Sequence, residues 1–227
     1  MYAQPVTQEA REVEIFTGAG SLHGTLIVPP GAAGIVLFAH GSGSSRLSPR
    51  NRTVAADLQE AGLATLLFDL LTEREEAVDQ YDANLRFDIG LLAERLEAAT
   101  DWALRDAAVR DLAIGYFGAS TGAAAALVAA AASPEVVKAV VSRGGRPDLA
   151  GEALARVVAP TLLIVGSEDT EVLRLNQYAM RQMPDAPVQL EIVRGATHLF
   201  EEPGTLEKVS ALAADWFRFH LGGTPRE

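Results

Sequence analysis

The segment LAIGYFGASTG, Leu112 to Gly122, gives the clearest indication of the fold of this 227-residue chain. Its first part, Leu112 to Phe117, is an almost continuous apolar run, and the alanine-rich stretch Gly122 to Ala132 follows. Such a run predicts a strand that helices bury on both faces, as in a parallel sheet. The alanine-rich stretch is far shorter than the ~20 residues that cross a bilayer, so it predicts a buried helix.

Between the strand and the helix, Gly118, Ser120 and Gly122 form the pattern G-x-S-x-G. This pattern is typical of a serine held on a sharp strand-to-helix turn, where side chains two residues away would collide with neighbouring backbone. Ser120 is therefore the predicted catalytic nucleophile. The alternative is that Ser120 only caps the following helix.

The rest of the chain repeats the alternation of strand and helix and predicts a single α/β domain, residues 1–227, with a mostly parallel, doubly wound sheet. An antiparallel hairpin is expected before it, with Gly18-Ala19-Gly20 at its turn. The charged stretch Glu73 to Asn84 lacks periodicity and is interpreted as a surface loop. The predicted strands are Val13–Phe16, Leu22–Val28, Ile35–Ala39, Ala64–Phe68, Leu112–Phe117, Val136–Val141, Thr161–Val165 and Val188–Val193; the other predicted helices are Val54–Ala61, Ile89–Leu104, Val172–Met180 and Leu206–Phe219.

A glycine-rich loop, His40-Gly41-Ser42-Gly43-Ser44, directly follows the strand Ile35 to Ala39. Glycine lets the backbone approach a substrate oxygen, so an amide of this loop could join that of Thr121 in binding an oxyanion. We assign this donor to the amide of Ser42, with Gly43 as the nearest competitor. A plain glycine-rich turn is the alternative. His40 is interpreted as a structural histidine.

The predicted acid is Asp169, which follows the strand Thr161 to Val165 and so lies at the carboxyl end of the sheet, where catalytic groups gather. Its neighbour Glu168 is the main competitor, and Asp169 could instead only cap the next helix. His198 is the predicted general base because the other three histidines lie in the first hairpin, the glycine loop and the last helix. Asp69, at the end of an earlier strand, is interpreted as structural.

Together these motifs make the chain resemble the α/β-hydrolase superfamily and, within it, the dienelactone-hydrolase-like group. The resemblance covers nearly the whole length and implies the α/β-hydrolase fold, whose triad follows the same order of serine, acid and histidine. The dienelactone hydrolases proper use a cysteine nucleophile, whereas this chain has Ser120 and no cysteine. This difference favours ordinary ester cleavage over hydrolysis of dienelactone itself.

Many members of this superfamily carry a helical lid after the sixth strand. Here only Ser142 to Ala159 separate that strand from the next, enough for a turn and one short helix. An open site without a large lid is therefore expected. Three nearby arginines could bind a carboxylate or phosphate of the substrate, although solvated surface roles are the alternative; they are Arg143, Arg146 and Arg46.

The composition of the chain disfavours several classes of binding partner. Thirty acidic against nineteen basic residues give a net charge of −11, which opposes binding to nucleic acid and to anionic membranes. No metal-ligand motif and no dinucleotide-binding glycine pattern is present, so neither a metal nor a cofactor is expected. The segment Met1 to Pro5 lacks the pattern of a secretory signal, and a cytoplasmic location is expected. The sequence leaves the oligomeric state open.

The expected activity is hydrolysis of carboxylic esters of small soluble substrates through an acyl-enzyme on Ser120. The same three side chains would also serve a thioester, lactone or amide hydrolase or an acyltransferase. A catalytically silent homologue that binds a ligand remains the alternative outside enzymes.

Overall fold

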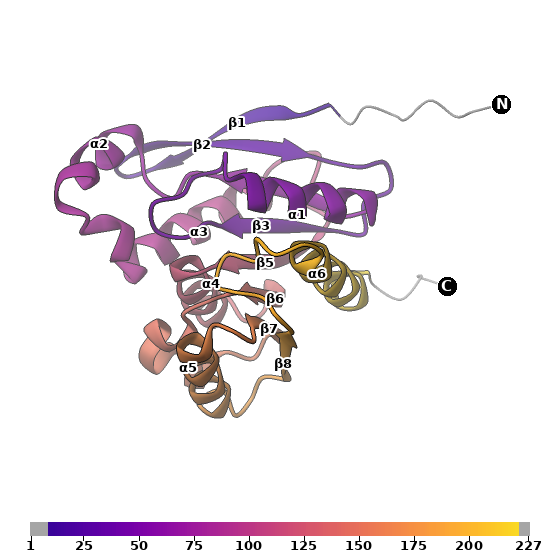
Figure 1. Cartoon of the computed structure of the whole chain (residues 1–227). Helices are drawn as coiled ribbons and strands as arrows, with labels where there is room; N and C mark the ends of the chain where they lie inside the picture. Colours follow the sequence, from indigo (N-terminus) through magenta and orange to yellow (C-terminus); the bar gives the residue numbers. More distant parts are fainter. Residues whose placement is uncertain (1–8, 223–227) are drawn as a thin grey trace.

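A computed structural model of the protein describes residues 9–222 of the chain. Eight strands form one sheet, and helices pack on both of its faces (Figure 1). The strands are β1 (Arg11–Thr17), β2 (Gly20–Ile27), β3 (Gly34–Ala39), β4 (Ala64–Phe68), β5 (Ala113–Ala119), β6 (Val137–Arg143), β7 (Thr161–Gly166) and β8 (Val188–Val193). The helices are α1 (Pro49–Glu60), α2 (Glu73–Asp82), η1 (Leu85–Phe87), α3 (Ile89–Ala103), α4 (Thr121–Ala132), η2 (Pro147–Arg156), α5 (Thr170–Arg181) and α6 (Thr205–Leu221).

The strand order in the sheet is β1-β2-β4-β3-β5-β6-β7-β8. β1 pairs with β2, and β2 with β4, in antiparallel fashion, whereas all later pairs are parallel. The predicted fold class, a mostly parallel doubly wound sheet with an N-terminal antiparallel hairpin, is confirmed. Because β3, β5, β6, β7 and β8 run in the same direction, the loops that follow them all open at one edge of the sheet.

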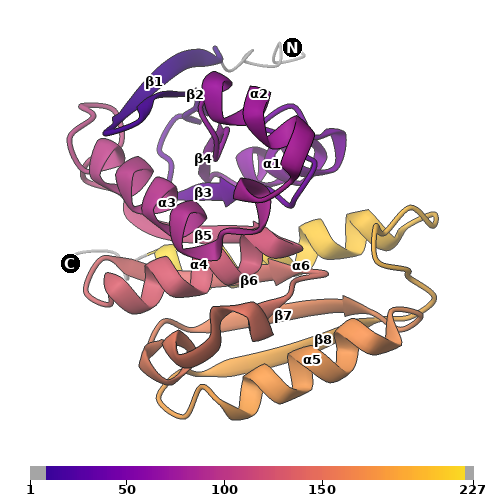
Figure 2. The same ribbon diagram turned by 90° about the vertical axis from the view of Figure 1, so that its left-hand side faces the viewer.

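Two apolar cores hold the helices against the sheet. One contains residues of α1 and α6 together with one face of the central strands, including Val54, Phe117 and Phe217. The other contains residues of α3 and α4, including Leu96 and Leu127, against the opposite face. Figure 2 shows α3, α4 and α5 on the side of the sheet away from α6. The strands between these layers are buried on both sides, which explains their nearly continuous apolar sequences.

The interpretation of Glu73 to Asn84 as a loop was wrong, since residues Glu73–Asp82 form α2. Polar groups stabilise this helix instead of an apolar stripe. Thr72 and Glu75 form a reciprocal capping box at its first turn. At the other end the fully buried carboxylate of Asp79 accepts hydrogen bonds from Arg86 and from the amide of Leu85. Hydrophobic periodicity could not detect a helix that is held in this way.

The connection between β6 and β7 contains only the short helix η2, which is kinked at Gly151. No large lid is inserted there, as the sequence predicted. None of the helices in residues 9–222 has the length and apolar character that crossing a membrane requires.

Candidate active site

Ser120 lies between β5 and α4 with φ 50° and ψ −121°, a backbone conformation that residues other than glycine rarely adopt. The flanking glycines are required by close packing. A Cβ on Gly118 would come closer than 3.0 Å to the backbone of Ala123, and one on Gly122 would meet the carbonyl of Ala39. The backbone thus forms the sharp turn that the G-x-S-x-G pattern predicts, and it presents Ser120 at the carboxyl edge of the sheet.

Asp169 and His198 meet at the same edge. Asp169 Oδ2 lies 2.6 Å from His198 Nδ1, and the side chains are 15% and 38% exposed. A carboxylate on Nδ1 fixes the ring so that Nε2 can act as a base. The carboxylate of Glu168, the competing acid, instead accepts a hydrogen bond from the hydroxyl of Ser167. Asp169 also precedes α5, but its side chain makes no capping hydrogen bond there.

The loop that carries His198 reaches back from β8 over the ends of β7 and β6. A Cβ on Gly166 would collide with the carbonyl of Ala196, and one on Gly144 would lie 3.0 Å from the carbonyl of His198. From the sequence, Gly166 marked only the end of a strand, and the close packing of neither glycine was predicted. Among the described residues no hydrogen bond joins Ser120 to His198; such bonds are often long before substrate binds.

The glycine-rich loop lies beside Ser120. A Cβ on Gly41 would be 3.1 Å from the Cβ of Ser120, and Gly43 adopts a positive φ of 69°. The amide of Ser42, the predicted oxyanion donor, donates to Thr121 Oγ1 at 2.9 Å. The two predicted donor residues therefore lie side by side, but the amide of Ser42 is already bonded to the side chain of Thr121.

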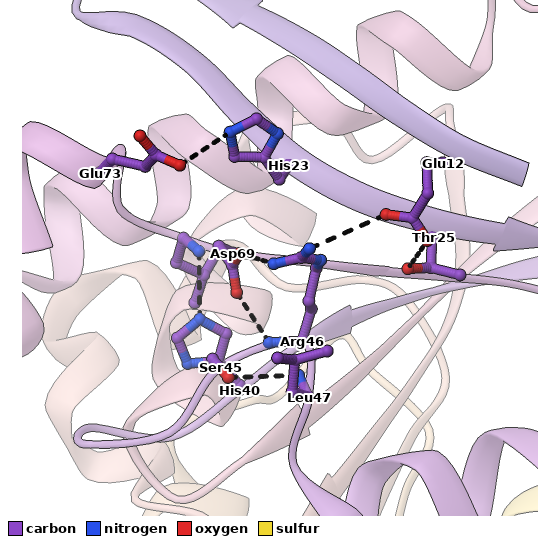
Figure 3. A network of polar contacts seen from close by, with 10 residues as sticks. Glu12, His23, Thr25, His40, Ser45, Arg46, Leu47, Asp69 and Glu73 are labelled. Atoms are coloured by element: carbon purple, nitrogen blue, oxygen red, sulfur yellow. Dashed lines mark hydrogen bonds and ion pairs between the residues drawn. The ribbon is translucent and has the colours of Figure 1, made fainter.

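His40 ties this loop to the segment after β4 (Figure 3). Its Nδ1 donates to the carbonyl of Gly41 at 3.0 Å, and its Nε2 accepts from the amide of Leu70 at 3.1 Å. Burial lowers the pKa of His40, which keeps the neutral ring that this pair of bonds requires. Next to it, Asp69 accepts from both the amide and the guanidinium of Arg46. These contacts fit the structural roles predicted for His40 and Asp69.

The three arginines singled out from the sequence differ in their surroundings. Arg46 pairs with Asp69, and Arg146 makes two hydrogen bonds with Asp148. Arg143 is buried at the end of β6, and within residues 9–222 its only side-chain hydrogen bond goes to Asn51, at 3.4 Å. Burial, with repulsion from the nearby Arg50, lowers the pKa of Arg143 to about 10. Arg50 was not singled out from the sequence; it lies in the first turn of helix α1, which begins five residues earlier than predicted.

Comparisons with known proteins show the family and the fold of this chain. The model of the dienelactone hydrolase family matches residues 22–219. The crystal structure of a dienelactone hydrolase from Anabaena variabilis is 57% identical, with a TM-score of 0.92, and the match covers 94% of this chain and 99% of that one. An esterase from Pyrococcus furiosus, at 19% identity and a TM-score of 0.77 over 95% of this chain and 93% of that one, shares the fold.

Curated relatives from two strains of Mycobacterium tuberculosis carry the provisional name phosphoribosyl transferase. Each is 59% identical over 212 residues, which are 93% of this chain and 47% of the relative. This chain thus spans about half the length of those proteins.

Proposed function

The chain belongs to the dienelactone hydrolase family, and we propose that it is a serine hydrolase of small carboxylic esters, with Ser120, His198 and Asp169 as its catalytic residues. The observation that carries the proposal is the convergence of two separate features at one edge of the sheet. One is the constrained turn that exposes Ser120, and the other is the 2.6 Å contact between His198 and Asp169.

In the proposed mechanism, His198 takes the proton of Ser120 as the serine oxygen attacks the ester carbonyl. Asp169 orients the imidazole and stabilises its cationic form. The oxyanion lies between the amide of Thr121 and the loop of Ser42 and Gly43. His198 then protonates the leaving alcohol, and water repeats these steps on the acyl-enzyme to release the acid.

The test is covalent labelling of the purified protein with a fluorophosphonate, located by peptide mass spectrometry, together with hydrolysis of p-nitrophenyl butyrate. We expect the label on Ser120. Ser120→Ala should remove the label and lower kcat by ~10³ to 10⁶ while the protein stays folded. Near wild-type turnover by this variant would exclude Ser120 as the nucleophile.

A metal-free mechanism is part of the proposal. Within residues 9–222 no three carboxylate or histidine side chains lie close enough together to hold a metal ion. Incubation with EDTA should therefore leave ester hydrolysis unchanged. A loss of activity that zinc restores would contradict the mechanism.

Esters are proposed ahead of thioesters, lactones and amides, all of which the same residues could cleave. Comparing kcat/KM across matched substrates with the same acyl group would rank these classes. The alternative of a silent ligand-binding homologue predicts a folded protein that neither reacts with the fluorophosphonate nor turns over any member of the panel.

The buried Arg143 supports a preference for esters with an anionic group. Its Nε and Nη1 atoms are buried and, among the described residues, have no hydrogen-bond partner. A carboxylate or phosphate beside them would supply the missing acceptors and offset the repulsion from Arg50. Arg46 and Arg146 already have carboxylate partners and are weaker candidates.

The matched test is the ratio of kcat/KM for a p-nitrophenyl hemisuccinate to that for the butyrate. Arg143→Met should lower this ratio at least tenfold, while Arg146→Met should leave it within about threefold. Equal ratios in wild type and Arg143→Met would contradict the assignment.

Phosphoribosyl transfer is a second candidate, favoured only by the name of the 59% identical relatives. Because this chain spans about half of each relative, the name need not describe the matching half. Phosphoribosyl diphosphate should not be consumed by this chain in the presence of nucleobases. Such consumption, with its rate unaffected by Ser120→Ala, would support the second candidate.

A further inference from the structure

The side chain of Thr121 occupies a position that the mechanism above does not use. Thr121 is the first residue of α4, directly after the nucleophile, and is only 5% exposed. Its Oγ1 accepts the amide proton of Ser42 at 2.9 Å, across 79 residues of chain. The contact joins the glycine-rich loop to the turn that carries Ser120.

This bond uses the N–H of Ser42, but Thr121 still has two donors without a partner in the described part of the chain, its O–H and its amide N–H. A hydroxyl has one proton to donate and two lone pairs, so accepting from Ser42 leaves the O–H of Thr121 free. Within residues 9–222 that O–H has no acceptor, and neither does the amide N–H of Thr121, which belongs to the first turn of α4. Amides in the first turn of a helix have no partner inside the helix.

We propose that Thr121 supplies two donors to the oxyanion, its amide and its hydroxyl, and that the Ser42 amide acts through that hydroxyl as a positioning group. The inference rests on the proposed serine hydrolase mechanism. This step involves no proton transfer: the Thr121 O–H donates a hydrogen bond to the charged oxygen and keeps its proton. Because Oγ1 already accepts from Ser42, the O–H becomes more polarised and a stronger donor.

The contrasting arrangement is the simple one, in which Ser42 or Gly43 donates directly to the oxyanion. If Gly43 is that donor, the Thr121 hydroxyl would have no effect on kcat. If Ser42 is that donor, the Thr121 hydroxyl would lower kcat, because the substrate oxygen would have to displace the hydroxyl from the Ser42 amide. The proposal predicts that removing this hydroxyl lowers kcat, whereas the contrasting arrangement predicts an unchanged or increased kcat.

The experiment compares Thr121→Val, which keeps the shape but cannot donate or accept, with Thr121→Ser, which keeps the hydroxyl. On a soluble p-nitrophenyl ester, Thr121→Val should lower kcat by ~10² to 10³, the usual loss for one oxyanion donor, with KM within a few-fold. Thr121→Ser should retain kcat within about tenfold of wild type. Unchanged or increased kcat in Thr121→Val would overturn the proposal.

Binding of a trifluoromethyl ketone, which forms an oxyanion on the serine, separates catalysis from structure. Its inhibition constant should rise in Thr121→Val in parallel with the loss of kcat/KM, as expected for a transition-state contact. If the hydroxyl only supports the fold, the Tm of Thr121→Val would fall but the inhibition constant would not rise, and the proposal would fail.

Failure of the inference can be told apart from failure of the proposed function. A wild-type protein that neither hydrolyses esters nor takes the fluorophosphonate overturns both. A wild-type protein that does both, alongside a fully active Thr121→Val, overturns the role of the hydroxyl alone.

Discussion

Ser120 should be a strained residue, and the strain can be measured by comparing two variants at this position. A non-glycine residue at φ 50°, ψ −121° costs about 1–3 kcal/mol relative to relaxed backbone. Ser120→Ala keeps the Cβ and therefore the strain. Ser120→Gly removes the strain but loses about 0.5–1 kcal/mol to the greater freedom of glycine in the unfolded chain. The glycine variant should thus be more stable than the alanine variant by ~1 kcal/mol.

For a chain of this size, ~1 kcal/mol corresponds to about 2–4 °C in Tm. The assay is thermal unfolding of both variants, with urea unfolding as a second measurement. Ala98→Gly, within α3, is the matched control because its backbone is helical. That substitution should lower Tm by about the same amount. Replacing alanine by glycine should therefore raise the stability at position 120 and lower it at position 98. A Ser120→Gly variant less stable than Ser120→Ala would show that the backbone at Ser120 is not strained.

Three further outcomes are expected. Asp169→Asn should lower kcat by up to ~10⁴, whereas Glu168→Gln should leave it within a few-fold; the reverse ranking in an ester assay would move the acid by one residue. Asp79→Asn should lower the free energy of unfolding by up to ~3 kcal/mol at pH 7, because partly exposed Arg86 loses its charged partner. Although burial opposes the charge of Asp79, hydrogen bonds from Arg86 and Leu85 lower its pKa. This stability is present above the ordinary aspartate pKa and lost as pH falls through the lowered one, so urea unfolding should show the gap between wild type and variant narrowing in acid. Finally, p-nitrophenyl acetate and butyrate should show smooth saturation and higher kcat/KM than palmitate, since a site without a large lid has nothing to open at an oil surface; a jump in rate at the solubility limit would contradict this.

The sequence predicted the sheet well because its strands are buried on both faces. An apolar run such as Thr161 to Val165 has few other stable environments, and turn residues mark its ends. The same logic located the candidate site, since Ser120 and Asp169 both follow such runs and must lie at one edge. The boundaries of exposed elements were less predictable. α1 begins at Pro49, before its apolar residues, because a proline after the capping Ser48 can start a helix without any apolar contact.

Long-range polar contacts could not be predicted in this way. α2 is stabilised at its end by Asp79, whose partner Arg86 lies beyond the helix, in the following short helix η1. The bond from Ser42 to Thr121 joins residues whose proximity depends on how β3 and β5 pair. Neither contact changes the pattern of apolar residues, which is the signal that sequence reasoning uses.

The site is built mainly from backbone, and this determines where its chemistry can vary. Gly118, Gly122 and Gly166 each lie where a Cβ would come closer than 3.0 Å to backbone atoms, so the turn at Ser120 and the path of the loop with His198 depend on close approach of main chains. Side chains that do not shape these contacts can change without moving the frame. Thr121 and Arg143 are of this kind: one faces the amide of the glycine-rich loop, and the other keeps buried donors without partners among the described residues. Differences in rate and substrate preference between proteins with this frame should therefore map to such positions, while substitution of the three glycines should abolish the site itself.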